Sequence, residues 1–210
     1  METKMKNYNV GIIGATGMVG QRFAVLLENH PWFNVKVLAA SPRSAGKTYK
    51  EAVGSRWLIE KPMPKAMEDI VIMDATADIE KIASQVDFVF CAVDMKKDEI
   101  KALEEAYAKH ECPVMSNNSA NRFTDDVPMI IPEINDEHMA IVEAQKKRLG
   151  TKRGFISVPR GCYIHLEKKA AKNILRNINA SLVAQGRLIQ GISTFEEDSG
   201  RPLTLDNFLS

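Results

Sequence analysis

The stretch Gly11-Ile12-Ile13-Gly14-Ala15-Thr16-Gly17-Met18-Val19-Gly20-Gln21-Arg22-Phe23 decides the fold, because a nonpolar strand passes through a glycine turn into an amphipathic helix. Each glycine has a physical reason: Gly14 permits the tight turn, Gly17 lets backbone N–H groups approach a pyrophosphate, and Gly20 lets the helix pack on the strand. The N-terminus of the helix adds partial positive charge beside a phosphate. The stretch therefore predicts a cradle for a dinucleotide.

Short apolar runs alternate with helical patterns along the first 150 residues. Strands separated by helices in this order predict an α/β fold with a doubly wound parallel sheet, a Rossmann-type domain. The run 87–93 is continuously apolar after its first residue, which predicts a strand covered on both faces. We expect strands over residues 8–13, 33–40, 70–73, 87–93, 113–116 and 154–158.

Two helices can be oriented from the spacing of their apolar residues. In the first helix, Val19, Phe23, Leu26 and Leu27 are predicted to face the sheet. A later helix places Ile100, Leu103 and Tyr107 on one face, with Asp94 as its expected N-cap, and Asn135 is expected to cap a helix that starts at Asp136.

Composition excludes several function classes. The 210 residues carry a net charge of +1 with 45% hydrophobic and 26% charged residues, which offers no electrostatic basis for binding nucleic acid or an anionic membrane. No apolar run is long enough to cross a bilayer, and residues 1–9 lack the apolar core of a secretion signal, so the expected location is cytoplasmic. The cysteines, Cys91, Cys112 and Cys162, are odd in number and lack CxxC spacing, so neither a disulfide framework nor a metal site is expected.

The residues after the second strand indicate which dinucleotide binds. An acidic residue there accepts hydrogen bonds from a free ribose hydroxyl, whereas basic and hydroxyl groups suit a 2′-phosphate. This chain has Ser41, Arg43 and Ser44 at that place, with Lys47 close behind. The pattern favours NADP; the alternative is that Arg43 and Lys47 belong to an ordinary surface loop.

The character of the chain changes after Gly150. The strand 154–158 leads to Cys162 and then to a basic segment whose apolar residues recur every four positions, which predicts a helix. We therefore expect a NADP-binding domain over residues 1–156 and a short, mainly helical C-terminal appendage over 157–210. The apolar residues of the expected helix are Leu166, Ala170, Ile174, Ile178 and Leu182.

Separated motifs carry a family resemblance. They are the glycine turn Gly14–Gln21, the loop Ser41–Lys47, and the run Ser116–Arg122, followed by Val127-Pro128 and Pro132-Glu133-Ile134-Asn135. In this order they resemble aspartate-semialdehyde dehydrogenase, most closely the archaeal and fungal branch, over about residues 8 to 156. The resemblance implies NADP-dependent reduction of aspartyl phosphate to aspartate semialdehyde, on the route to lysine, threonine and methionine.

The resemblance also implies roles for single residues. Arg122 stands where the family has an arginine, and a planar cation that grips two oxygens suits the phosphate of the substrate; a surface arginine is the alternative. Cys91, Ala92 and Val93 are implied to lie near the nicotinamide. The implied cofactor-binding residues are Gly14, Thr16, Gly17, Met18, Val19, Ser41, Arg43, Ser44, Cys91 and Ala92.

Cys162 is the candidate nucleophile. Attack on an acyl phosphate needs a thiolate, because sulfur both expels phosphate and leaves a thioester that hydride can reduce. The family has its cysteine at the same distance from a Gly-Phe-Ile strand start, here Gly154-Phe155-Ile156, but Gly161 stands where the family has asparagine. Cys162 could instead be a packing residue, and His165 a general base or a polar residue at a helix start.

Three functions remain open from the sequence. The family continues beyond its cysteine for about as many residues again, whereas 48 residues follow Cys162 without a matching motif. The chain is thus either a reductase with an altered catalytic part or an inactive NADP-binding module, such as a truncated family member. A reductase of acetylglutamyl phosphate fits the run 119–135 less well. Small-molecule substrates and phosphate are the expected partners, and a homo-oligomer stays open.

Overall fold

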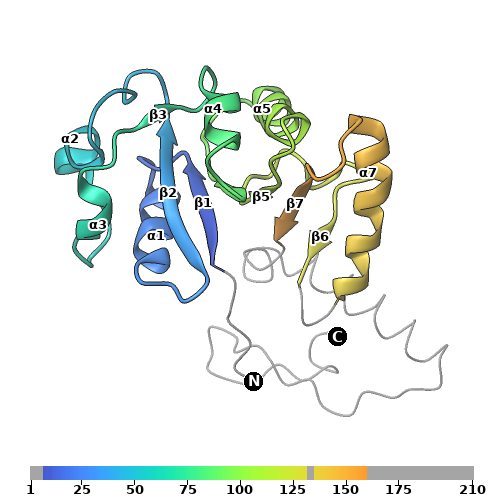
Figure 1. Ribbon diagram of the computed structural model, residues 1–210, viewed down its shortest axis with the longest axis horizontal. Coiled ribbons are helices and arrows are strands. Elements are labelled where there is room, and N and C mark those ends of the chain that lie inside the picture. The colour runs from blue at the N-terminus through green and yellow to red at the C-terminus, as the bar shows by residue number, and fades with distance from the viewer. Residues whose placement is uncertain (1–6, 132–134, 160–210) are drawn as a thin grey trace, which may run out of the picture. The chain divides into compact units, whose positions relative to one another are not determined.

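The computed structural model describes residues 7–131 and 135–159, which belong to the first of two units, Met1–Pro159. Its strands form one parallel sheet in the order β3-β2-β1-β4-β5-β7-β6 (Figure 1). The doubly wound sheet that the sequence predicts is therefore confirmed. The elements are β1 (Tyr8–Ile13), α1 (Met18–Leu27), β2 (Phe33–Ala40), α2 (Tyr49–Val53), the 3-10 helix η1 (Gly54–Arg56), α3 (Lys65–Glu68), β3 (Met73–Asp74), α4 (Ile79–Ala83), β4 (Phe88–Cys91), α5 (Lys97–Lys109), β5 (Val114–Ser116), β6 (Met129–Ile130), the 3-10 helix η2 (Asp136–Ile141), α7 (Val142–Leu149) and β7 (Ile156–Pro159).

The core is divided between the two faces of the sheet. On one face, Ile13 and Ala39 pack with residues of α4 and α5, including Leu103. On the other face, Ile12 and Leu38 pack with residues of α1, α2 and α3. Neighbouring residues of one strand thus enter different cores, as expected when side chains alternate across a sheet with helices on both sides.

The face that helix α1 turns to the sheet is only partly the predicted one: Leu27 is buried and Phe23 packs against the core, as predicted. Val19 and Leu26 are 37% and 59% exposed, so the prediction that they are buried is wrong. The buried residues are Gly20, Gln21, Ala24, Val25 and Leu27. Because Gly20 and Ala24 are small, the backbone of the helix can approach β1 closely. This close approach sets the rotation of the helix. The spacing of apolar residues alone does not predict it.

Some predicted boundaries shift. Residues 70–73 were expected as a strand, but β3 is Met73–Asp74, and Val71 instead forms an isolated antiparallel bridge with Thr48. In β4, Val89 and Cys91 are buried while Phe88 and Phe90 are only half-buried, so among the described residues one face of this strand is less covered than predicted. The short strand β6 has no counterpart among the predicted strands.

Of two predicted helix caps, one lies at a different residue, and the other has the predicted position without a capping bond. Helix α5 begins after Lys96 rather than Asp94, and the Lys96 amide donates to the Glu99 carboxylate at 3.2 Å. Asn135 does precede η2, but its side chain makes no capping bond. It accepts from the Ile131 amide at 2.7 Å and donates to the Met129 carbonyl at 2.9 Å, so it closes the loop after β6 instead.

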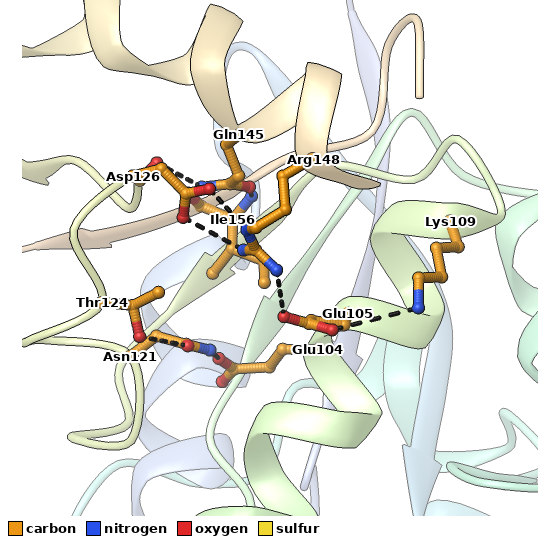
Figure 2. A network of polar contacts seen from close by, with 9 residues as sticks. All are labelled: Glu104, Glu105, Lys109, Asn121, Thr124, Asp126, Gln145, Arg148 and Ile156. Carbon is orange, nitrogen blue, oxygen red and sulfur yellow. Dashed lines mark hydrogen bonds and ion pairs between the residues drawn. The ribbon is translucent and has the colours of Figure 1, made fainter. Parts of the chain in front are cut away.

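Polar contacts attach the last described helix and strand to the rest of the sheet (Figure 2). The buried Gln145 side chain of α7 pairs with both backbone groups of Ile156, accepting from its amide at 2.6 Å and donating to its carbonyl at 3.0 Å. Arg148 grips Asp126 with two hydrogen bonds and reaches Glu105 of α5 at 2.6 Å. These contacts hold β7 beside β5.

The predictions for Cys162, His165 and the helix from Leu166 lie outside the described residues. Within the described ranges, no helix is long and apolar enough to cross a membrane.

Candidate cofactor site

The predicted cofactor residues meet at one edge of the sheet. The order of the strands reverses between β1 and β4, and the crevice beyond the carboxyl ends of strands at such a point is where open α/β sheets bind ligands. The turn from Gly14 follows β1, Ser41 follows β2, Ala92 follows β4 and Asn117 follows β5. Hydrogen bonds join these ends, since the Ala92 amide donates to the Ile13 carbonyl and the Asn117 amide to the Cys91 carbonyl, both at 2.8 Å.

The glycine turn has the geometry that its sequence predicts. Gly14 has a φ of +87°, and a Cβ there would lie 2.3 Å from the Ala92 carbonyl oxygen. A Cβ at Gly20 would lie 2.2 Å from the Gly14 carbonyl oxygen, so α1 packs closely on the turn. At Gly17 a Cβ would meet only the Gly14 carbonyl oxygen, at 3.5 Å, and Gly17 is exposed. Two glycines thus shape the turn, and Gly17 leaves space on its outer side.

That outer side offers hydrogen-bond donors. Among the described residues, the amides of Thr16, Met18 and Val19 have no acceptor, as expected for groups at the start of a helix. Such amides, together with the helix dipole, favour an anion. The residues present therefore fit a dinucleotide pyrophosphate.

Buried side chains donate hydrogen bonds to carbonyl groups of the same turn. The Tyr49 hydroxyl donates to the Ala15 carbonyl at 2.9 Å, and both Tyr49 and Ala15 are buried. Burial raises the pKa of Tyr49, so the phenol keeps its proton and remains a donor. The side-chain amide of the buried Gln21 donates to the Thr16 carbonyl at 3.0 Å and to the Arg56 carbonyl at 2.9 Å.

The loop after β2 presents the residues predicted to select the nucleotide. Ser41 and Arg43 are exposed at the carboxyl end of β2, whereas Ser44 is buried. The Ser44 amide donates to the Ser41 carbonyl at 2.9 Å, and the loop is tied to the segment before β3 through the Gly46 amide and the Ile72 carbonyl, also at 2.9 Å. Ser41 and Arg43 are thus the side chains of this loop best placed to meet a ligand.

Cys91 ends β4 as a buried, unreactive thiol. It is 1% exposed, and burial together with the nearby Glu104 carboxylate raises its pKa well above the ordinary value. The Asn118 side chain donates to its sulfur at 3.4 Å. The Cys91 sulfur is therefore unsuited to nucleophilic attack, and the implied place of Cys91 beside the nicotinamide stays a prediction.

Glu104 is a buried support of the segment 116–122 that the sequence interpretation missed. This α5 carboxylate is fully buried, and it accepts hydrogen bonds from the Ser116 hydroxyl and from Asn118 at 2.9 Å. It also accepts from Asn121 at 2.7 Å (Figure 2). All three donors belong to the segment 116–122, which carries the half-buried Arg122. Glu104 lies four residues after Ile100 on the predicted apolar face of its helix. A charged residue on a face predicted to be buried is the sequence feature that could have indicated a buried carboxylate.

Comparison with known proteins agrees with this geometry. Residues 9–142 match the family described as semialdehyde dehydrogenase, NAD binding domain. The aspartate-semialdehyde dehydrogenase of Archaeoglobus fulgidus is 40% identical over 155 residues, 74% of this chain and 43% of the relative. That of Saccharomyces cerevisiae is 41% identical over 157 residues, 72% of this chain and 41% of the relative. The chain thus aligns with less than half the length of these curated relatives.

A solved structure shows the same likeness. The aspartate-semialdehyde dehydrogenase of Candida albicans with NADP superposes with a TM-score of 0.63 at 36% identity, covering 73% of this chain and 42% of that one. The resemblance stated from the motifs is therefore confirmed. Since the family match covers well over half of the chain, the protein belongs to the semialdehyde dehydrogenase family and carries its NAD-binding domain.

Proposed function

We propose that the chain binds NADP at the carboxyl edge of the sheet and serves the reduction of aspartyl phosphate to aspartate semialdehyde. The observation that carries the proposal is the joint geometry of two loops: the open face of Gly17 with the amides of the first turn of α1, and the exposed Ser41 and Arg43 after β2. A pyrophosphate and a 2′-phosphate are the two anionic parts of NADP, and these loops offer donors for both. The similar protein from Candida albicans was solved with NADP.

The remaining roles follow from the chemistry of an acyl phosphate. Cys162 would attack the acyl carbon as a thiolate, so that a C–S bond forms, the C–O bond to phosphate breaks and a thioester remains on the enzyme. Arg122 would hold the phosphate through two hydrogen bonds. Bound NADPH supplies a hydride. When the thioester becomes an aldehyde, the Cys162 sulfur departs with the electrons of the C–S bond and is free for another turnover.

Turnover tests this function directly. The purified chain, given aspartate semialdehyde, inorganic phosphate and NADP, is expected to form NADPH at a rate that depends on phosphate. Cys162→Ser is expected to abolish the rate while leaving NADP affinity unchanged, because the hydroxyl is a far weaker nucleophile than the thiolate. Tight NADP binding without turnover in the unmodified chain would contradict the reductase and leave a nucleotide-binding module.

Arg43→Ala tests the choice of nucleotide. Loss of a charged hydrogen bond to the 2′-phosphate is expected to weaken NADP binding by roughly tenfold to a hundredfold and to leave NAD binding within about twofold. Calorimetric titration with both nucleotides measures the difference. Lys36→Ala is the control, because Lys36 is exposed on β2 away from its carboxyl end and its loss changes the net charge equally. Equal affinities for NADP in the Arg43→Ala and unmodified chains would refute the role of Arg43.

A further inference from the structure

Tyr49 contacts the phosphate turn from a distant part of the chain. It begins α2, 34 residues after Ala15, and its hydroxyl donates to the Ala15 carbonyl at 2.9 Å. The ring is fully buried and stacks edge-on against Trp57 with 6.3 Å between ring centroids. The ring therefore has its own packing, and the hydroxyl adds one directed contact to the turn.

The direction of that contact matters because peptide groups are rigid. In a planar trans peptide the carbonyl and the N–H of the next residue point in opposite directions. When the Ala15 carbonyl faces Tyr49 on the protein side, the Thr16 N–H must face away from it. Among the described residues the Thr16 amide has no acceptor.

The neighbouring peptide is held in the same manner. The buried Gln21 side chain donates to the Thr16 carbonyl at 3.0 Å, and its own oxygen accepts from the Leu58 amide at 2.8 Å. The carbonyls of Ala15 and Thr16 thus both point toward side-chain donors of the protein. A carbonyl that rotated outward would place a negative dipole end where an anion binds.

We propose that Tyr49 is a positioning residue for the cofactor, whose hydroxyl keeps the Ala15 carbonyl away from the pyrophosphate and the Thr16 amide directed at it. The inference rests on the proposed NADP site and adds a residue outside the glycine motif. Removal of the hydroxyl leaves the Ala15 carbonyl buried without its donor, which is unfavourable and therefore favours rotation of the Ala15–Thr16 peptide. Rotation weakens binding of the pyrophosphate and leaves the 2′-phosphate loop unchanged.

Tyr49→Phe in the full chain tests this, with Tyr107→Phe as a matched control. Tyr107 is equally buried, and its hydroxyl donates at 2.9 Å to the Ala75 carbonyl, which lies outside the turn. By calorimetry we expect Tyr49→Phe to weaken NADP binding on the order of tenfold. Adenosine 2′-monophosphate, which lacks the pyrophosphate, is expected to bind both variants and the unmodified chain alike.

The outcomes separate the inference from the function beneath it. If the unmodified chain binds no NADP, the proposed cofactor site fails. If the unmodified chain binds NADP, three results overturn the role of Tyr49. The first is that the Tyr49→Phe chain binds NADP as tightly as the unmodified chain, and the second is that its affinities for NADP and for adenosine 2′-monophosphate fall equally. The third is that its NADP affinity equals that of the Tyr107→Phe chain. If Tyr49→Phe does not fold, exchange of the Tyr49 hydroxyl proton is measured by NMR in the unmodified chain: NADP should slow it through the shared peptide, and unchanged exchange overturns the inference.

Discussion

Gly20→Ala is expected to destabilise the fold by about 3 kcal/mol or more and to remove NADP binding with it. The added Cβ would lie 2.2 Å from the Gly14 carbonyl oxygen and 2.7 Å from the Ala15 Cα, both backbone atoms that no rotamer change can move. Helix α1 would have to withdraw from β1, and this would open the phosphate turn. Urea denaturation followed by circular dichroism measures the loss.

Gly17→Ala is the matched control, because its Cβ would meet nothing closer than 3.5 Å. At this N-cap position, with φ −78° and ψ 165°, alanine fits the backbone and is expected to cost no more than about 1 kcal/mol. NADP affinity should nevertheless fall by about tenfold or more, since the methyl group occupies the side of the turn that faces the pyrophosphate. A Gly20→Ala chain as stable as the Gly17→Ala chain would refute the packing argument.

Glu104→Ala is the second change with a large expected effect, a destabilisation of roughly 3 kcal/mol or more. The substitution removes the acceptor of Ser116, Asn118 and Asn121 together. Ser116 and Asn121 are buried, so water cannot easily replace the carboxylate. The free energy of unfolding, obtained from urea titration, is the measurement.

Glu105→Ala provides the comparison on the same helix. The Glu105 side chain is 29% exposed and pairs with Arg148 and Lys109, so its loss is expected to cost about 1 kcal/mol or less. Glu104→Gln should fall between the two alanine variants, because one oxygen remains to accept from Ser116 and Asn118. If the two alanine variants were equally stable, Glu104 could not be what holds the segment 116–122.

Prediction from sequence succeeded where a property is local. The φ of Gly14 and the close approach at Gly20 follow from the turn itself, and the burial of Ile100, Leu103 and Tyr107 follows from helical spacing. Prediction failed for part of the face of α1, because Val19 and Leu26 are apolar but exposed, whereas Leu27 is buried as predicted. Apolar spacing alone cannot tell which of two adjacent stripes meets the sheet; small residues at Gly20 and Ala24 decided it.

By itself, then, the sequence determined the glycine cradle and the alternation of most strands and helices, since these depend on residues only a few positions apart. That alternation implied a parallel sheet, because parallel neighbours are joined through helices. The tertiary structure alone decided which buried polar groups support the cradle and the segment 116–122. Tyr49 reaches Ala15 across 34 residues, and Glu104 gathers donors that lie 12 to 17 residues further along the chain. Such hydrogen bonds have strict limits of distance and angle, and only the packed sheet brings their partners within those limits.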